Sequence, residues 1–174
     1  MSFSVSQFKS RVASEGFLRS AHYDVMINAP VGGFNNIHLR TESASLPGNA
    51  HLNVDVYRPY NTGVVYTIPY SYNPTPVTCA HTIDSNSELI KSFWNWNNKI
   101  TDLEGYEHKH AANYHNEYVG SMIILVRGPD GSTKSTYILN EVYPESIDQV
   151  QMSWGSEDIV RLNVSYRYSS YRVI

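Results

Sequence analysis

The sequence has little of several patterns, and each shortage excludes a class of protein. It contains a single cysteine, Cys79, so no internal disulfide framework can form, which favours folding in a reducing compartment. It contains no run of about 18 apolar residues, the length that a membrane-spanning helix needs. Residues 1–15 lack the basic region and apolar segment of a secretory signal. We therefore expect a chain without a membrane partner.

Charged residues are also few, and their number and distribution argue against nucleic-acid binding and catalysis. Charged residues make up 17% of the 174 residues and the net charge is −3, whereas a tight nucleic-acid binder is usually basic. The pair Gly32-Gly33 lacks the spacing and the following lysine of a phosphate-binding loop. The carboxylates are scattered, so no acid–base pair can be nominated. We expect no cofactor, no catalytic residues and no enzymatic activity.

Two groups of residues still resemble reactive sites. His108, His110 and His115 lie near several glutamates, and imidazoles at this spacing bind zinc or copper in other proteins. A polar loop or a subunit contact explains the same residues, so we expect no metal and keep a metal- or ligand-binding β module as an alternative function. Cys79 and His81 fall on one face of a predicted strand, as in thiolate–imidazole pairs. A buried free cysteine is more often a small apolar packing residue.

From Ala21 onward the dominant period is two, which indicates strands with one buried and one polar face. The 14 tyrosines suit strands and contact surfaces. An Asp130-Gly131 pair predicts a hairpin turn. The segment 119–126 is apolar through its second half and is expected to be covered on both sides. The clearest strands are expected at Tyr23–Ile27, Leu52–Val56, Val119–Val126 and Val160–Tyr168.

Two segments have helical spacing instead. Phe3–Ser14 suits either a short amphipathic helix or an arm that orders against a partner. Ser85–Glu88 has the spacing of a capping box, and the apolar residues after it predict a helix over Asn86–Asn98. We expect an arm or short helix in residues 1–20 and one mainly β domain, an antiparallel sandwich or barrel-like fold with one packed helix, in residues 21–174. The expected packing residues of this core are Leu89, Phe93, Trp94 and Trp154.

The sequence offers surfaces rather than a reactive site. The final strand, Ile159–Tyr168, carries no proline or clustered lysine, and it is either an ordinary twisted edge or a template for pairing with another copy. Three excursions from the core pattern are candidate contacts: the arm, the hairpin-like His51–Pro69 and the polar loop Asp102–Asn113. The expected subunit and ring contacts are His51, Asn53, Asp55, Tyr57, Arg58, Arg161 and Arg167.

The order of motifs from Ala21 to Tyr168 resembles the tail tube proteins of contractile-tailed bacteriophages. A first strand is followed by a small-residue segment that ends in Leu-Pro, then by the hairpin, a threonine-containing strand and a helix with an aromatic pair. The C-terminal third is the most specific part of the match. The motifs are Tyr23–Ile27, Glu42–Gly48, His51–Pro69, Val77–Asp84, Phe93-Trp94, Asp130-Gly131, Tyr137–Pro144, Val150–Trp154 and Val160–Tyr168.

This resemblance implies a structural virion protein that forms a homo-hexameric ring with a shared inner β-barrel. Stacked rings would make a DNA-conducting tube inside a contractile sheath, with sheath and baseplate proteins as partners. Four strands from each of six subunits, spaced about 4.8 Å and tilted about 45°, close a barrel roughly 50 Å across with a bore of about 40 Å. Double-stranded DNA would pass without specific binding, and the tube would be assembled in the cytoplasm of the host bacterium.

Some residues depart from the family pattern and leave alternatives open. Tyr70–Pro76 stands where the family usually has a Gly-Asp-Arg type of turn, so a baseplate tube initiator or a neck tube terminator of the same fold is an alternative. Related tubes also occur in type VI secretion and contractile injection systems. Arg161 and Arg167 would be awkward in a DNA conduit. We predict that they pair with acidic residues or face a neighbouring subunit or the sheath.

Overall fold

The computed structural model describes residues 4–57, 65–101, 112–155 and 158–174. Strands dominate the described residues, and every described strand pairing is antiparallel, so the predicted mainly β class is confirmed. The helices are α1 (Val5–Glu15), α2 (Ile37–Arg40), α3 (Glu88–Ile100) and α4 (His115–Tyr118). The strands are β1 (Tyr23–Asn28), β2 (Thr41–Ala44), β3 (Gly48–Tyr57), β4 (Val65–Thr75), β5 (Val77–Thr82), β6 (Gly120–Arg127), β7 (Thr133–Ile147), β8 (Arg161–Arg167) and β9 (Ser170–Val173).

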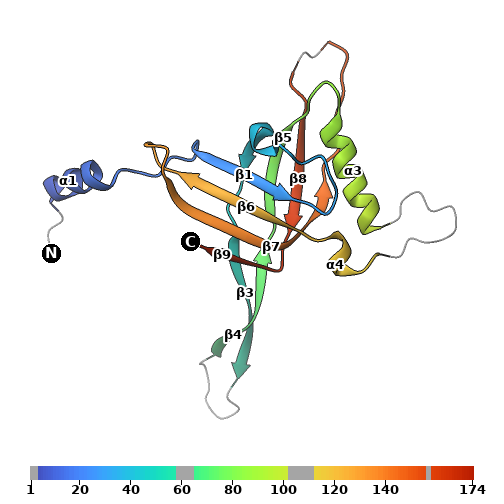
Figure 1. Cartoon of the computed structure of the whole chain (residues 1–174). Helices are drawn as coiled ribbons and strands as arrows, with labels where there is room; N and C mark the ends of the chain where they lie inside the picture. Colours follow the sequence, from blue (N-terminus) through green and yellow to red (C-terminus); the bar gives the residue numbers. More distant parts are fainter. Residues whose placement is uncertain (1–3, 58–64, 102–111, 156–157) are drawn as a thin grey trace.

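Two sheets share the long strand β7. Its first part pairs with β6 and β9, and β6 continues to β1. Its last part pairs with β8, which continues to β5 and β2. The change occurs at Glu141, which has φ 54° and is the extra residue between the pairs Asn140–Ser121 and Val142–Gly120. This bulge bends β7, so that the strands of the two sheets cross (Figure 1).

The core lies between the inner faces of these sheets, where alternate residues of each strand are buried. Helix α3 lies along one side of the sandwich (Figure 1). Burial of this set supplies the main stabilising free energy of the subunit, at about 25 cal/mol per Å² of apolar surface. The inward residues include Val25, Ile27, Met122, Ile124 and Leu139 from one sheet, and Val77, Cys79, Leu162, Val164 and Tyr166 from the other.

Helix α3 buries a different stripe from the one predicted. Leu89 and Phe93 are buried, but Trp96 takes the third position and its Nε1 donates to the Tyr118 carbonyl at 2.7 Å. Trp94 is 43% exposed, so the prediction that it packs in the core is wrong. Each helical residue turns about 100°, which puts Trp96 seven residues after Leu89 on the same face and turns Trp94 away. Trp154 is fully exposed in the β7–β8 connection, so the prediction that it packs in the core is also wrong.

The predicted capping box is also wrong. Helix α3 begins at Glu88, and the residue before it, Ser87, has φ 54° and no side-chain capping bond. The hydroxyl that bonds inside the helix belongs to Ser92, which donates to the Glu88 carbonyl at 2.9 Å. The helix is therefore held by burial of its apolar face rather than by its cap.

Two strand predictions need correction. The strand predicted to be the last, Ile159–Tyr168, corresponds to β8, which is followed by β9 and is not an edge because it lies between β5 and β7. The apolar strand Val119–Val126 corresponds to β6, which is central but buried on one face only, its other face being half-buried. Ile123 and Leu125 therefore lie on a partly exposed surface of the single subunit. The segment is apolar on both faces although the subunit covers just one.

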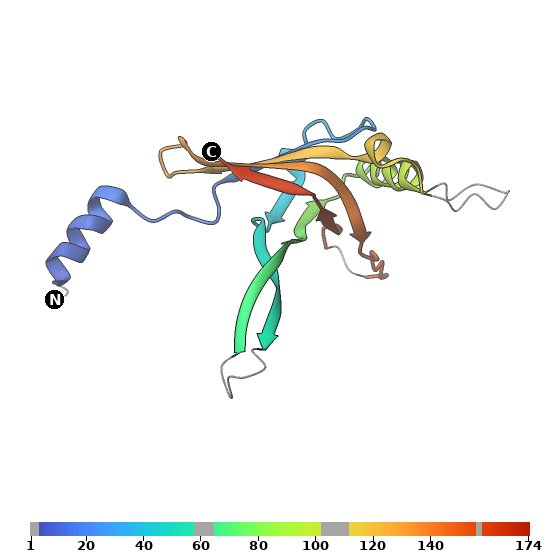
Figure 2. The same ribbon diagram turned by 90° about the horizontal axis from the view of Figure 1, so that it is seen from below.

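Two elements project from the sandwich. The β3–β4 hairpin extends away from both sheets, and α1 lies apart from the body at the end of an extended segment (Figures 1 and 2). Helix α1 agrees with the helical alternative for Phe3–Ser14, and Val5 on it is largely exposed. Among the helices of the described ranges, none is long and apolar enough to cross a membrane.

Candidate assembly surfaces

Among the described residues, the sheet formed by the end of β7, β8, β5 and β2 has an open edge on each side. On one side the last residues of β7 pair with no described strand other than β8. On the other side β2 pairs with no described strand other than β5, and β3 follows it into the hairpin. Because unpaired backbone N–H and C=O groups along an edge are templates for another strand, both edges can accept a further copy.

The hairpin is a direct continuation of this sheet. The chain passes from β2 through Pro47 into β3, and from β4 through Pro76 into β5. At this junction the Ser45 N–H donates to the Thr78 carbonyl at 2.9 Å, and the Thr78 N–H donates to Ser45 Oγ at 2.8 Å. The Tyr168 hydroxyl donates to the Gly48 carbonyl at 3.3 Å. The base of the hairpin is thus bonded to β5 and to Tyr168, the residue that follows β8.

The outer face of β8 is polar, and each of its two arginines forms an ion pair with a glutamate. Arg161 Nε donates to Glu42 Oε2 at 2.5 Å, and Arg167 forms an ion pair with Glu145 at 3.4 Å. The bond from Arg161 lowers the pKa of Glu42 and keeps this carboxylate charged. The sequence predicted that these arginines pair with acidic residues or face a neighbouring subunit or the sheath. The structure shows the first arrangement for both. Asn163 lies between them on the same face.

The hairpin carries the predicted contact residues on one face and an apolar surface on the other. His51, Asn53 and Asp55 are exposed on alternate positions of β3, Tyr57 is the last residue of that strand, and Arg58 lies outside the described residues. Asp55 accepts a bond from Thr67 Oγ1 at 2.8 Å across the hairpin. The opposite face of β3 was predicted to be buried, and in the subunit it is exposed. Its residues are Leu52, Val54 and Val56, with Tyr66 and Ile68 on β4.

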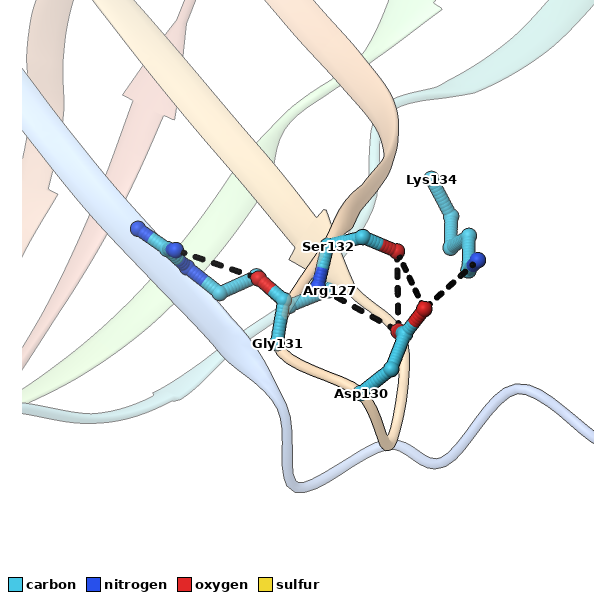
Figure 3. A network of polar contacts seen from close by, with 5 residues as sticks. All are labelled: Arg127, Asp130, Gly131, Ser132 and Lys134. Atoms are coloured by element: carbon cyan, nitrogen blue, oxygen red, sulfur yellow. Dashed lines mark hydrogen bonds and ion pairs between the residues drawn. The ribbon is translucent and has the colours of Figure 1, made fainter.

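The β6–β7 turn is the hairpin predicted from Asp130-Gly131. Gly131 has φ 76°, and Asp130 accepts bonds from the N–H and the hydroxyl of Ser132 and from Lys134 Nζ (Figure 3). These bonds lower the pKa of Asp130, with Ser132 as the largest cause. Arg127 donates to the Gly131 carbonyl and pairs with Asp24 on β1 at 2.6 Å. These bonds therefore fix the turn at one end of the sheet that contains β1, β6, β7 and β9.

The Cys79–His81 pair is buried and forms no nucleophile. Burial raises the pKa of Cys79 to about 12 and lowers the pKa of His81 to about 4, so both groups are neutral at pH 7. The Thr41 hydroxyl donates to the Ile37 carbonyl at 2.9 Å, so it accepts from His81 Nδ1 at 3.1 Å. His81 Nε2 then accepts from the Tyr166 hydroxyl at 2.9 Å. This chain of bonds satisfies a core histidine.

The metal-like cluster falls largely outside the described residues. His108 and His110 lie in the range 102–111, whereas His115 and Glu117 are on α4. Within the part of the chain that the structure describes, no group of three or more His, Cys, Asp or Glu side chains is placed to hold a metal ion.

Comparison with known proteins identifies the architecture. The sequence pattern of the family described as "Phage tail tube protein" matches residues 5–174, which is nearly the whole chain. The chain belongs to the phage tail tube protein family. This confirms the resemblance derived from the motif order, and it makes the chain a tail-tube-type structural protein.

Solved structures show that this tail tube fold recurs at low sequence identity. A chain from the sheath–tube complex of PVC, an extracellular contractile injection system, has a TM-score of 0.65 and 16% identity, covering 99% of both chains. A chain from the anti-feeding prophage baseplate has a TM-score of 0.66 and 13% identity, covering 90% of this chain and 94% of that one. A chain from the anti-feeding prophage cap has a TM-score of 0.64 and 14% identity, covering 91% of each. No curated protein matches the chain.

Proposed function

We propose that this protein is the repeating subunit of the tail tube of a contractile-tailed bacteriophage. Six copies close a ring, and rings stack into a conduit for double-stranded DNA inside a contractile sheath. The observation that carries the proposal is the pair of open edges on the β7–β8–β5–β2 sheet. A sheet with two free edges and a polar outer face suits a wall that continues from subunit to subunit.

Lateral closure follows from these edges. The end of β7 in one subunit pairs with the β2–β3 edge of the next, and each subunit supplies four strands. About 24 strands then enclose the bore of about 40 Å that the strand spacing and tilt allow. In this arrangement the outer face of β8 lines the bore.

The charges of this face suit passage without binding. Arg161 and Arg167 pair with Glu42 and Glu145, so neither arginine is left to hold a phosphate. Each phosphate neutralised by a free Lys or Arg would add salt-dependent affinity and slow the DNA. Six copies, each with a net charge of −3, also repel a polyanion.

The remaining partners come from the family and the projecting segments. The sheath surrounds the tube, the baseplate begins it, and assembly takes place in the cytoplasm of the host bacterium, giving a virion protein. The hairpin residues His51, Asn53, Asp55, Tyr57 and Arg58, the N-terminal arm and the loop Asp102–Asn113 are the candidate ring-to-ring contacts. Residues 102–111 of that loop lie outside the described residues.

A second candidate is a tube initiator or terminator. It is favoured by the fold likeness to chains from a baseplate and from a cap, with TM-scores of 0.66 and 0.64. Copy number separates the two roles. A repeating subunit is among the most abundant proteins of purified particles, whereas an initiator or terminator is present as a single ring.

Electron microscopy of the purified protein tests the proposal. We expect sixfold rings and, at higher concentration or with a baseplate seed, stacked tubes. A bismaleimide that links Ser43→Cys on β2 to Ser146→Cys on β7 should give covalent products of up to six subunits, because Cys79 is buried and does not compete. Each variant with only one of the two introduced cysteines is the control and should give no product larger than a dimer. Monomers under all conditions would overturn the proposal.

A further inference from the structure

The subunit carries an exposed apolar surface at each end of the sheet formed by the end of β7, β8, β5 and β2. The first is the hairpin face, defined as Leu52, Val54 and Val56 of β3 with Ile68 of β4. Each of these side chains keeps between 41% and 49% of its surface exposed. The register places Val54 opposite Ile68, so the four side chains form one continuous strip. Within the described residues of β3 and β4 this face carries no charged side chain, since Asp55 points to the opposite side.

The second surface is the end loop, defined as Met152, Trp154 and Ile159 in the connection between β7 and β8. Met152 is 79% exposed, Ile159 is 64% exposed and Trp154 is fully exposed. Gly155 follows the tryptophan with φ 95°, a conformation that a side chain rarely adopts, so a turn presents Trp154 outward. Three large apolar side chains on one loop are unusual for a subunit that acts alone.

The two surfaces lie at opposite ends of the molecule. The hairpin leaves one end of the β5–β8 sheet, and the β7–β8 connection closes the other end (Figure 1). The chain runs from β2 into β3 and from β4 into β5, so the hairpin extends along the strand direction of this sheet. The β7–β8 connection lies at the opposite end of the same sheet. Coaxial copies stacked in one orientation therefore bring the hairpin of one copy to the end loop of the next.

Each surface needs a partner for physical reasons. A two-stranded ribbon is marginally stable in water unless another element covers one of its faces. An exposed tryptophan loses little conformational entropy on docking and buries about 150–250 Å², which makes it a typical anchor of an interface. The hairpin face and the end loop are both apolar, so each can cover the exposed apolar side chains of the other.

We propose that the hairpin face of one copy docks on Met152, Trp154 and Ile159 of a copy in the next ring. This inference rests on the proposed function and assigns the receptor of the ring-to-ring joint. The contact is heterologous, because different surfaces of the two copies meet, and a heterologous contact along an axis continues without closing. Since the joint is apolar, high salt strengthens stacking instead of dissolving the tube.

Two single substitutions test the two halves of the joint. Val54→Asp places a carboxylate in the hairpin face, and Trp154→Ser removes the anchor. Both sites are exposed in the subunit, so we expect folded rings whose stacking needs at least about thirtyfold more protein for each joint lost. The matched control is Tyr114→Ser, an 80% exposed aromatic outside both surfaces, which should stack like the wild type. Met152→Ser is the substitute if Trp154→Ser fails to form rings.

Mixing the two variants distinguishes this joint from others. Val54→Asp rings keep an intact end loop and Trp154→Ser rings keep an intact hairpin, so a mixture should give stacks of two rings and no longer tubes. Electron microscopy and analytical ultracentrifugation count the rings. Wild-type-like stacking of either variant, or single rings in the mixture, would overturn the inference while leaving the tube function in place.

Two further outcomes are equally decisive. Failure of wild-type rings to stack, even on a seed, would remove both the inference and the proposed function. Normal stacking of both variants with loss of binding to purified sheath protein would mean that the two surfaces face the sheath, and the inference would be wrong.

Discussion

Single residues decide how the core accepts polar groups. His81 sits at the centre of the sandwich with both ring nitrogens bonded, one to Thr41 and one to Tyr166. This arrangement needs the neutral ring, because one nitrogen donates and the other accepts. Burial lowers the pKa of His81 from 6.5 to about 4, in agreement with that requirement.

The depressed pKa of His81 predicts acid sensitivity of the isolated subunit. The folded value of about 4 lies below the unfolded value of 6.5, so the stabilisation is complete above pH 6.5 and declines as the pH falls towards 4. We expect a loss of about 3 kcal/mol in the free energy of unfolding between pH 7 and pH 4 from this group. Urea unfolding of wild type and His81→Gln at both pH values measures it. Equal pH dependence of the two proteins would contradict the prediction.

At the scale of elements, the bend of β7 decides the architecture. One strand serves two sheets because the bulge at Glu141 redirects it, and this residue holds φ 54° without being glycine. A left-handed conformation costs a non-glycine residue about 1–2 kcal/mol. The surrounding ladders with β6, β8 and β9 compensate for this strain.

Glu141→Gly is expected to stabilise the subunit by about 0.5–1 kcal/mol, because glycine adopts positive φ without strain and the side chain is exposed. Thr133→Gly is the matched control, since Thr133 is an exposed residue of the same strand that is not among the positive-φ residues. That variant should lose about 0.5–1 kcal/mol. Thermal unfolding measures both changes. A loss at both sites would show that the bulge is not strained.

At the scale of the whole molecule, folding and assembly reside in different parts. The buried core belongs to the sandwich and α3, whereas the exposed apolar residues of β3 and β4 lie on the projecting hairpin. The base of the hairpin is anchored to the body at Gly48, whose carbonyl accepts a bond from Tyr168, and the described parts of β3 and β4 extend away from it (Figure 2).

Replacing residues 50–73 with an Asn-Gly turn should therefore leave a folded subunit that forms no tubes. The melting temperature should stay within a few degrees of wild type, because the core between the sheets is unchanged. Circular dichroism measures the melting and electron microscopy scores the tubes. Loss of a cooperative transition would mean that the hairpin is part of the folding unit.

Local sequence patterns were sufficient for the four clearest strands, the β6–β7 turn and the family. Tyr23–Ile27 and Val160–Tyr168 alternate because each has one face in the core, and this periodicity is visible without tertiary structure. This periodicity did not show whether Trp94 or Trp96 is buried, because the rotation of the helix is set by the sheets that α3 packs on. The exposed face of Leu52–Val56 was mistaken for core because a surface awaiting a partner has the same alternation as a buried one.

The sequence by itself therefore determined the mainly β class, the hairpin at Asp130-Gly131 and membership of the tube family, because these depend on neighbours along the chain. The tertiary structure alone decided that β8 is internal, that β7 bends at Glu141, and that the hairpin and the β7–β8 connection lie at opposite ends. Strand order is set by pairing between residues that are distant in sequence, and no local pattern records which strand becomes an edge.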